Sequence, residues 1–179
     1  ATKHKEGGFY YVVLDLPKAT DCTKGVHVFR FKIDHPTQKD LLWGISPFQT
    51  AVQPPSYSSP HVYGWQVYGQ KCCGGKRTDD KRYNFMSKYS LILLDVRVDC
   101  ECHTATFKPI KLEPIDNAES VQKMIDEEYV IDDLPLDITS SKGWVPHVQM
   151  YYTGSSVSVC YVDPELFGVY DENIDAMMP

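Results

Sequence analysis

Hydrophobic and polar residues alternate through much of the chain, and this period of two predicts β-strands rather than helices. The clearest example is 26–33, where one face carries His27, Phe29, Phe31 and Ile33 and the other carries Val28, Arg30 and Lys32. We expect the face with the phenylalanines to be buried. Residues 91–98 form an apolar run interrupted by Asp95 and Arg97, which is typical of a central strand.

Five further segments are rich in β-branched and aromatic residues and are bounded by proline, glycine, serine or aspartate. They are 41–46, 61–68, 104–110, 144–150 and 155–162. We expect 104–110 to pair with 91–98, and 144–150 to form an antiparallel hairpin with 155–162. Residues 53–60 contain three prolines and must form a loop.

One segment has helical periodicity. Residues 118–128 follow Asp116 and Asn117 as N-cap candidates and carry Val121, Met124 and Ile125 on one side. This helix lies in the acidic stretch 116–137, which we interpret as a solvated insertion. The pattern as a whole predicts an all-β sandwich or barrel with one short helical insertion.

The length of 179 residues suits a single domain. We expect this domain at 9–170, with flexible polar ends at 1–8 and 171–179. The net charge of −6 argues against a nucleic-acid partner, and no apolar run approaches the ~20 residues that span a membrane. The chain has no signal-peptide pattern and no glycosylation sequon, so we expect a reducing compartment, the cytoplasm or the nucleus.

Two patterns could carry chemistry, and both have weak spacing. Cys72, Cys100, Cys102 and His103 are possible zinc ligands, but adjacent cysteines diverge and a Cys-x-Cys pair in a strand is a poor tetrahedral site. The six cysteines are therefore expected to be reduced and metal-free. Residues 69–78 resemble a phosphate-binding loop, but Gly75 stands where the lysine belongs, so we favour a basic turn. With no nucleophile or metalloprotease motif, we expect no enzyme and no cofactor.

Several tyrosines lie next to residues that favour turns. Tyrosines in such positions can contact a protein partner, or they can pack into the end of the sandwich core. Both interpretations remain open for Tyr57, Tyr63, Tyr151 and Tyr152.

Six segments in order resemble the strands of the SPRY (B30.2-related) domain family, a two-sheet antiparallel β-sandwich used for protein recognition. They include Tyr63-Gly64-Trp65, which is similar to the family's Tyr/Trp-Gly-Trp strand, and Leu91-Ile92-Leu93-Leu94-Asp95, which is similar to its Gly-Val-Leu-Leu-Asp strand. Residues 99–116 depart from the family pattern. The resemblance implies that Trp65 faces the core and that partners bind loops at one end of the sandwich.

Within this resemblance, Tyr57 and the turn Tyr152-Thr153-Gly154 lie where one branch of the family binds short peptides. We expect the loops 17–24, 53–60 and 151–154 to converge into a partner-binding face. The candidate contact residues are Lys18, Gln53, Tyr57, Tyr63, Tyr152, Thr153 and Gly154.

The expected function is non-enzymatic binding of a protein or peptide by a monomeric domain of a larger protein. The resemblance implies substrate recruitment in a ubiquitin ligase or signalling protein. The alternative is a zinc- or nucleotide-dependent enzyme or sensor on the same scaffold, built on the cysteines or on the turn at 71–76.

Overall fold

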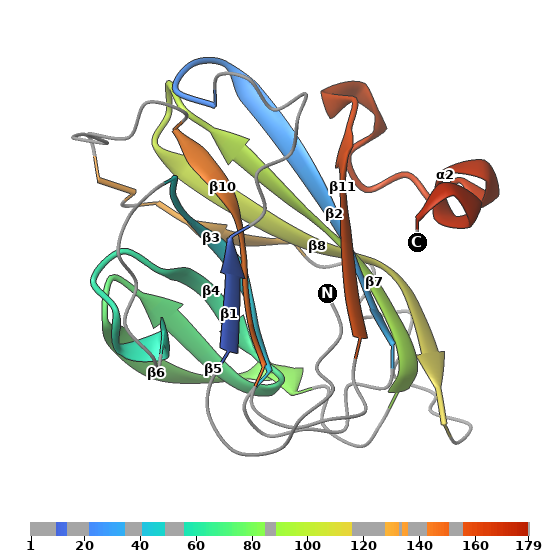
Figure 1. Ribbon diagram of the computed structural model, residues 1–179, viewed down its shortest axis with the longest axis horizontal. Helices are drawn as coiled ribbons and strands as arrows, with labels where there is room; N and C mark the ends of the chain where they lie inside the picture. The colour runs from blue at the N-terminus through green and yellow to red at the C-terminus, as the bar shows by residue number, and fades with distance from the viewer. Residues whose placement is uncertain are drawn as a thin grey trace.

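The computed structural model describes residues 10–13, 22–34, 41–48, 56–84, 89–115, 128–132, 134–135, 143–150 and 156–178. These ranges form two antiparallel sheets packed as a β-sandwich, the predicted fold class (Figure 1). The six-stranded sheet has the order β1 (Tyr10–Val13), β10 (Trp144–Met150), β3 (Leu42–Pro47), β4 (Tyr63–Gln66), β5 (Tyr68–Cys73), β6 (Lys76–Asn84). The five-stranded sheet has the order β11 (Ser156–Val162), β2 (Val26–Asp34), β7 (Tyr89–Asp99), β8 (Thr104–Pro114), β9 (Tyr129–Ile131).

Helical structure in the described ranges is short. It comprises the 3₁₀ turns η1 (Ser56–Ser58) and η2 (Pro164–Leu166) and the helix α2 (Glu172–Met177). No helix in these ranges has the length and apolar character needed to span a membrane. The predicted helix at 118–128 lies, except for its last residue, outside the described residues.

Most predicted strands are confirmed within a few residues, including the pairing of β7 with β8. The predicted strand 61–68 divides at Val67 into β4 and the start of β5. The predicted hairpin of 144–150 with 155–162 is wrong. Strand β10 pairs with β1 and β3 in one sheet, whereas β11 pairs with β2 in the other. Alternation identifies the face of each strand, but it does not identify the partner.

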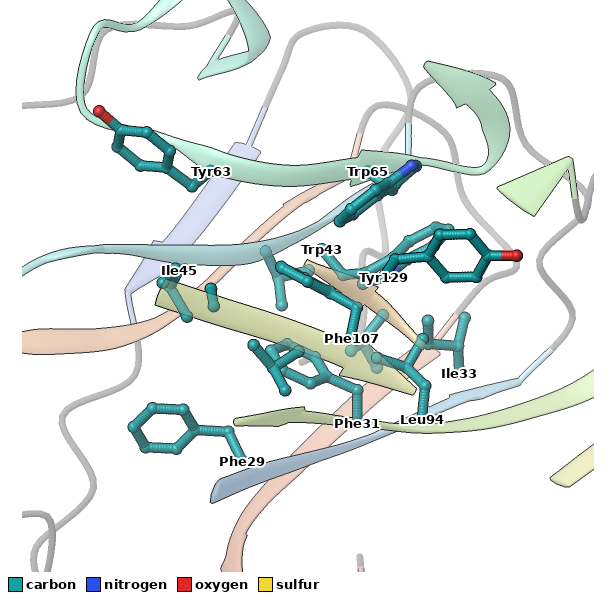
Figure 2. Packing of buried hydrophobic residues seen from close by; sticks show 14 of the residues in the cluster. Phe29, Phe31, Ile33, Trp43, Ile45, Tyr63, Trp65, Leu94, Phe107 and Tyr129 are labelled. Atoms are coloured by element: carbon teal, nitrogen blue, oxygen red, sulfur yellow. The ribbon is translucent and has the colours of Figure 1, made fainter. Parts of the chain in front are cut away.

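The core fills the space between the sheets (Figure 2). Trp65 on β4 is 1% exposed and meets Phe107 of the opposite sheet edge-on, with ring centroids 4.5 Å apart. This agrees with the predicted inward orientation of Trp65. Phe29, Phe31 and Ile33 of β2 are buried as expected, whereas His27 on the same predicted face is half-buried. The three buried residues belong to one core cluster with Trp43, Ile45, Ile92, Leu94 and Val96.

Strands β3 and β4 approach closely at Gly44 and Gly64, which are register partners. A Cβ on Gly44 would lie 2.7 Å from the Gly64 Cα and would collide with the carbonyl oxygen of Tyr63. Neither glycine has a positive φ, so lack of space, not backbone conformation, requires glycine here. The adjacent pair Trp43 and Trp65 is also in register, and the close approach therefore fixes both indoles in the core.

Part of the outer face of the five-stranded sheet is buried too, including Val28 and Leu93. Arg30 of β2 is fully buried and forms a bidentate ion pair with Asp95 of β7, at 2.7 and 2.8 Å. The Arg30 guanidinium also donates to the carbonyl oxygens of Leu166 and Val169, and the Gly168 N–H donates to Asp95. The C-terminal segment thus adds three hydrogen bonds to this buried pair, whereas Nη1 of Arg30 has no hydrogen-bond partner in the described residues.

The same segment ends in α2, on the side of the five-stranded sheet away from the six-stranded sheet (Figure 1). Met178 is 5% exposed and packs against Leu93 and Ile110, with the half-buried Cys160 beside them. Within 171–179, predicted to be a flexible end, residues 172–177 form α2 and Met178 is buried.

We predict that Gly44→Ala and Gly64→Ala strongly lower the melting temperature, because the new methyl group collides with backbone that cannot move without separating β3 from β4. Gly25→Ala is the control. Gly25 has φ +73° with no neighbouring atom within 4 Å, so its replacement costs only the left-handed backbone strain of about 1–2 kcal/mol. Equal melting temperatures for all three variants would contradict the close approach.

Removing one member of the Arg30–Asp95 pair is expected to cost more than replacing both. Asp95→Ala leaves a buried guanidinium without its counter-charge, at a cost of about 3–5 kcal/mol. The double variant Arg30→Met/Asp95→Leu should lie closer to the parent in the free energy of unfolding measured in urea. Equal loss in the single and double variants would show that the pair is not a buried, coupled unit.

His147 predicts an acid sensitivity. Burial in β10 lowers the pKa of His147 to about 4, against an ordinary value of about 6.5. Between these values the unfolded chain binds a proton that the folded chain does not, so stability falls as the pH drops from about 6.5 to about 4, by up to about 3 kcal/mol. His147→Gln should therefore lose less stability than the parent between a pH of about 7.5 and about 4.5. Parallel melting-temperature curves for the two proteins would contradict this.

Candidate functional site

Five of the seven predicted contact residues lie outside the described residues: Lys18, Gln53, Tyr152, Thr153 and Gly154. The convergence of their loops therefore stays a prediction. Tyr57 and Tyr63 are described, and both lie beside the hairpin formed by β5 and β6.

This β5–β6 hairpin has a two-residue turn, Gly74-Gly75, closed by the register pair Cys73 and Lys76. The turn glycines have φ +55° and +80°, the combination that a type I′ hairpin turn requires and that glycine adopts without strain. The segment compared above with a phosphate-binding loop is thus two strands joined by a tight turn. Among the described residues, the next element after the hairpin is the strand β7 and not a helix.

Alternation gives the hairpin two distinct faces. Gln70 and Cys72 of β5 share the outer face with their register partners on β6, Asp79 and Arg77. The inner face carries Lys71, Cys73, Lys76 and Thr78. The two faces present different chemistry.

On the outer face, Tyr57 of η1 packs against a small buried cluster of Leu42, Val62 and Cys72. The guanidinium carbon of Arg77 lies 4.6 Å from the centre of the Tyr57 ring, a cation–π contact. We call this set, of which Arg77 and Asp79 are exposed and Tyr57 and Gln70 are half-buried, the Tyr57 surface. Gln70 joins it by accepting a hydrogen bond from Arg77 and donating one to Asp79.

The Cys72 thiol beneath Tyr57 is unsuited to act as a nucleophile. Burial, and then the nearby Cys73, raises the pKa of Cys72 to about 12. The thiol is therefore protonated at neutral pH and behaves as a small apolar side chain.

The inner face of the hairpin lines a cavity of about 530 Å³, together with β4 and β9. We call it the hairpin cavity, and its polar lining comes from Tyr63, Lys71, Cys73, Lys76, Thr78 and Asp132. Because β6 and β9 are the last strands of their respective sheets in the described chain, the cavity lies at an open side of the sandwich.

Tyr63 lies deep in this cavity, at 8% exposure, with its ring edge-on to Trp144 at 5.5 Å. Its hydroxyl lies below the hairpin turn, since a Cβ on Gly74 would come within 3.1 Å of it. Figure 2 shows this hydroxyl pointing away from the labelled core residues. Burial, and then Cys73, raises the pKa of Tyr63, so the phenol remains a neutral donor. The structure therefore places Tyr57 and Tyr63 on opposite faces of one hairpin.

The residues considered for zinc binding lie in different sheets. Cys72 is on β5, whereas Cys100 follows β7 and directs its thiol to the Cys22 carbonyl oxygen at 3.1 Å. None of the six cysteines, all within the described residues, forms a disulfide. Within the described ranges, no three histidine, cysteine or acidic side chains are close enough to hold a metal ion.

The sequence analysis named 71–76 only as the turn of the alternative nucleotide site, and it did not bring Lys71, Lys76, Thr78 and Asp132 together. A signal for part of this set exists, because Gly74-Gly75 between alternating residues is a hairpin pattern that places Lys71 and Lys76 on one face. No local pattern indicates that β9, more than fifty residues later in the chain, lies opposite this face.

Comparison by sequence finds nothing: no protein-family model and no curated protein matches the chain. Comparison by structure finds the SPRY domain of human HERC1, with a TM-score of 0.61 and 16% identity over 90% of this chain and 87% of that one. The TRIM65 PSpry domain matches less well, with a TM-score of 0.48 and 15% identity over 76% of this chain and 65% of that one. The likeness to the HERC1 domain, together with the two antiparallel sheets, shows that the chain folds as a divergent SPRY-like β-sandwich.

Proposed function

We propose that the chain is a protein-interaction domain without catalysis of its own, which binds a protein or short peptide through loops at one end of the sandwich. The observation that carries the proposal is the Tyr57 surface, where an aromatic ring is held half-buried between an apolar cluster and a guanidinium. Tyrosine and arginine are the residues that most often dominate binding energy at interfaces.

The physical argument concerns entropy. A tyrosine ring already fixed by Arg77 and the cluster beneath it loses little conformational freedom when a partner covers it. The ring then offers apolar area and a hydroxyl at low cost. The loop residues Lys18, Gln53, Tyr152, Thr153 and Gly154 belong to the same proposed face.

The wider context is part of this proposal and rests on the SPRY resemblance. A domain of this kind would recruit substrates within a ubiquitin ligase or a signalling protein, in the cytoplasm or nucleus. The recruited segment would be recognised by the loops of this domain, and the chemistry would belong to another part of the longer protein.

Tyr57→Ala is expected to reduce capture of the partner from cell lysate by about thirtyfold, because an anchor of this kind contributes ~2 kcal/mol. The melting temperature should stay within a few degrees of the parent, since Tyr57 is only partly buried. Tyr152→Ala should have the same effect. Partners captured by the parent are identified by mass spectrometry and then measured with each variant.

The matched control is Tyr170→Ala. Tyr170 also lies under a cation, with the Lys111 ammonium 4.9 Å from its ring, but it follows η2 on the five-stranded sheet. This variant should capture the partner as the parent does. If Tyr57→Ala and Tyr152→Ala also bind like the parent, the face lies elsewhere and the acidic stretch 116–137 becomes the next candidate.

A further inference from the structure

The hairpin cavity carries positive charge in a chain whose net charge is −6. Lys71 and Lys76 both line it, and neither forms an ion pair with any residue that the structure describes. The Lys71 ammonium lies 5.8 Å from the centre of the Trp65 ring. This contact with an aromatic ring does not neutralise the positive charge of Lys71. Two ammonium groups are thus directed to one cavity.

The net charge of the residues that line the cavity indicates the charge of the ligand group that it would bind. Two lysines and Asp132 leave a net charge of +1. Tyr63 and Cys73 add nothing at neutral pH, because burial raises the pKa of each. A single carboxylate matches this charge, whereas a phosphate monoester, at about −1.5 to −2, exceeds it and is repelled by Asp132.

The depth of the cavity suits a side chain entering from solvent. Lys76, Thr78 and Val130 are exposed and form the rim, whereas Tyr63 and Ile131 are nearly buried and form the base. The volume of about 530 Å³ lies in the range of ordinary ligand pockets, about 300–1,000 Å³. The hydroxyls of Thr78 and Tyr63 add neutral donors to the charges of the lysines.

The position of the cavity favours a peptide as the ligand. Strand β9 pairs only with β8 in the described chain, and its residues Val130 and Ile131 line the cavity. An extended segment can hydrogen-bond along the edge of such a strand while every second side chain turns toward the sandwich. The exposed Val130 and Asp132, which lie two residues apart along the chain, would then meet the peptide beside the pocket.

We propose that the hairpin cavity binds an acidic residue of an extended partner peptide, with its carboxylate held by Lys71 and Lys76 and by the Thr78 hydroxyl. This site rests on the proposed protein-binding function, deepens it by naming the chemistry recognised, and lies on the face of the hairpin opposite Tyr57.

The test uses an array of capped octapeptides with a central glutamate, each with matched copies carrying glutamine or phosphoserine. The parent should bind a subset of glutamate peptides at least about tenfold more tightly than their glutamine copies, and more tightly than the phosphoserine copies. Lys71→Met/Lys76→Met should remove this preference, because methionine keeps the length of the side chain but not its charge. The melting temperature of this double variant should stay near that of the parent.

The matched control is Lys24→Met, which removes one exposed charge outside the cavity and should leave the preference for glutamate unchanged. Equal binding of glutamate and glutamine copies, tighter binding of phosphoserine, or an unchanged preference in Lys71→Met/Lys76→Met would each overturn the site. Competition by free N-acetylglutamate at the same concentration as the peptide would overturn the peptide assignment, since it identifies a small acid as sufficient.

Failure of this site is distinguishable from failure of the proposed function. A partner that is captured by the parent, lost with Tyr57→Ala and retained with Lys71→Met/Lys76→Met would leave the protein-binding function intact and overturn the cavity as an acidic-residue site. If capture of the partner is lost with Lys71→Met/Lys76→Met but retained with Tyr57→Ala, the cavity site is supported, and the partner is assigned to the inner face of the hairpin instead of the outer face.

Discussion

The close approach of β3 and β4 at Gly44 and Gly64 is the constraint on which the rest of the sandwich depends. It allows the flanking tryptophans to lie in register on the core face, where Trp65 contacts Phe107 of the opposite sheet. The β5–β6 hairpin follows β4 after one residue, so its position relative to β9 is set by the same contact. A methyl group at either glycine would therefore disturb the core and both faces of the hairpin together.

The buried charges of the five-stranded sheet and the charges of the hairpin cavity have different roles. On the five-stranded sheet, Arg30 and Asp95 bind each other and the backbone of 166–169, so the pair serves to hold the C-terminal segment. Burial by itself would lower the pKa of Arg30, but the hydrogen bonds and charge of Asp95 outweigh this and hold it above its ordinary value. Lys71 and Lys76 form no such ion pair with a described residue, which is why we assign recognition to them.

Local patterns predicted the elements because a strand with one buried face must alternate, as 26–33 does, and because a central strand can be an apolar run, as 91–98 is. They failed where the partner is distant in the sequence. The burial of Arg30 depends on residues 166–169, and the separation of β10 from β11 into two sheets depends on β1, β2 and β3. Two residues of the candidate site, Tyr57 and Tyr63, were predicted from the sequence. Their opposite orientations, and the lysines between β6 and β9, depend on hairpin register and sheet packing.

The central claim is that the β5–β6 hairpin, with η1 beside it and β9 opposite its inner face, is where a partner binds. Hydrogen–deuterium exchange on the chain alone and in complex with its captured partner tests this claim most directly. The account predicts new protection of backbone amides at 56–62, 70–78 and 128–132, with little change at 26–34 and 156–178. Protection confined to the C-terminal segment and the five-stranded sheet, with the hairpin exchanging as in the free chain, would contradict it.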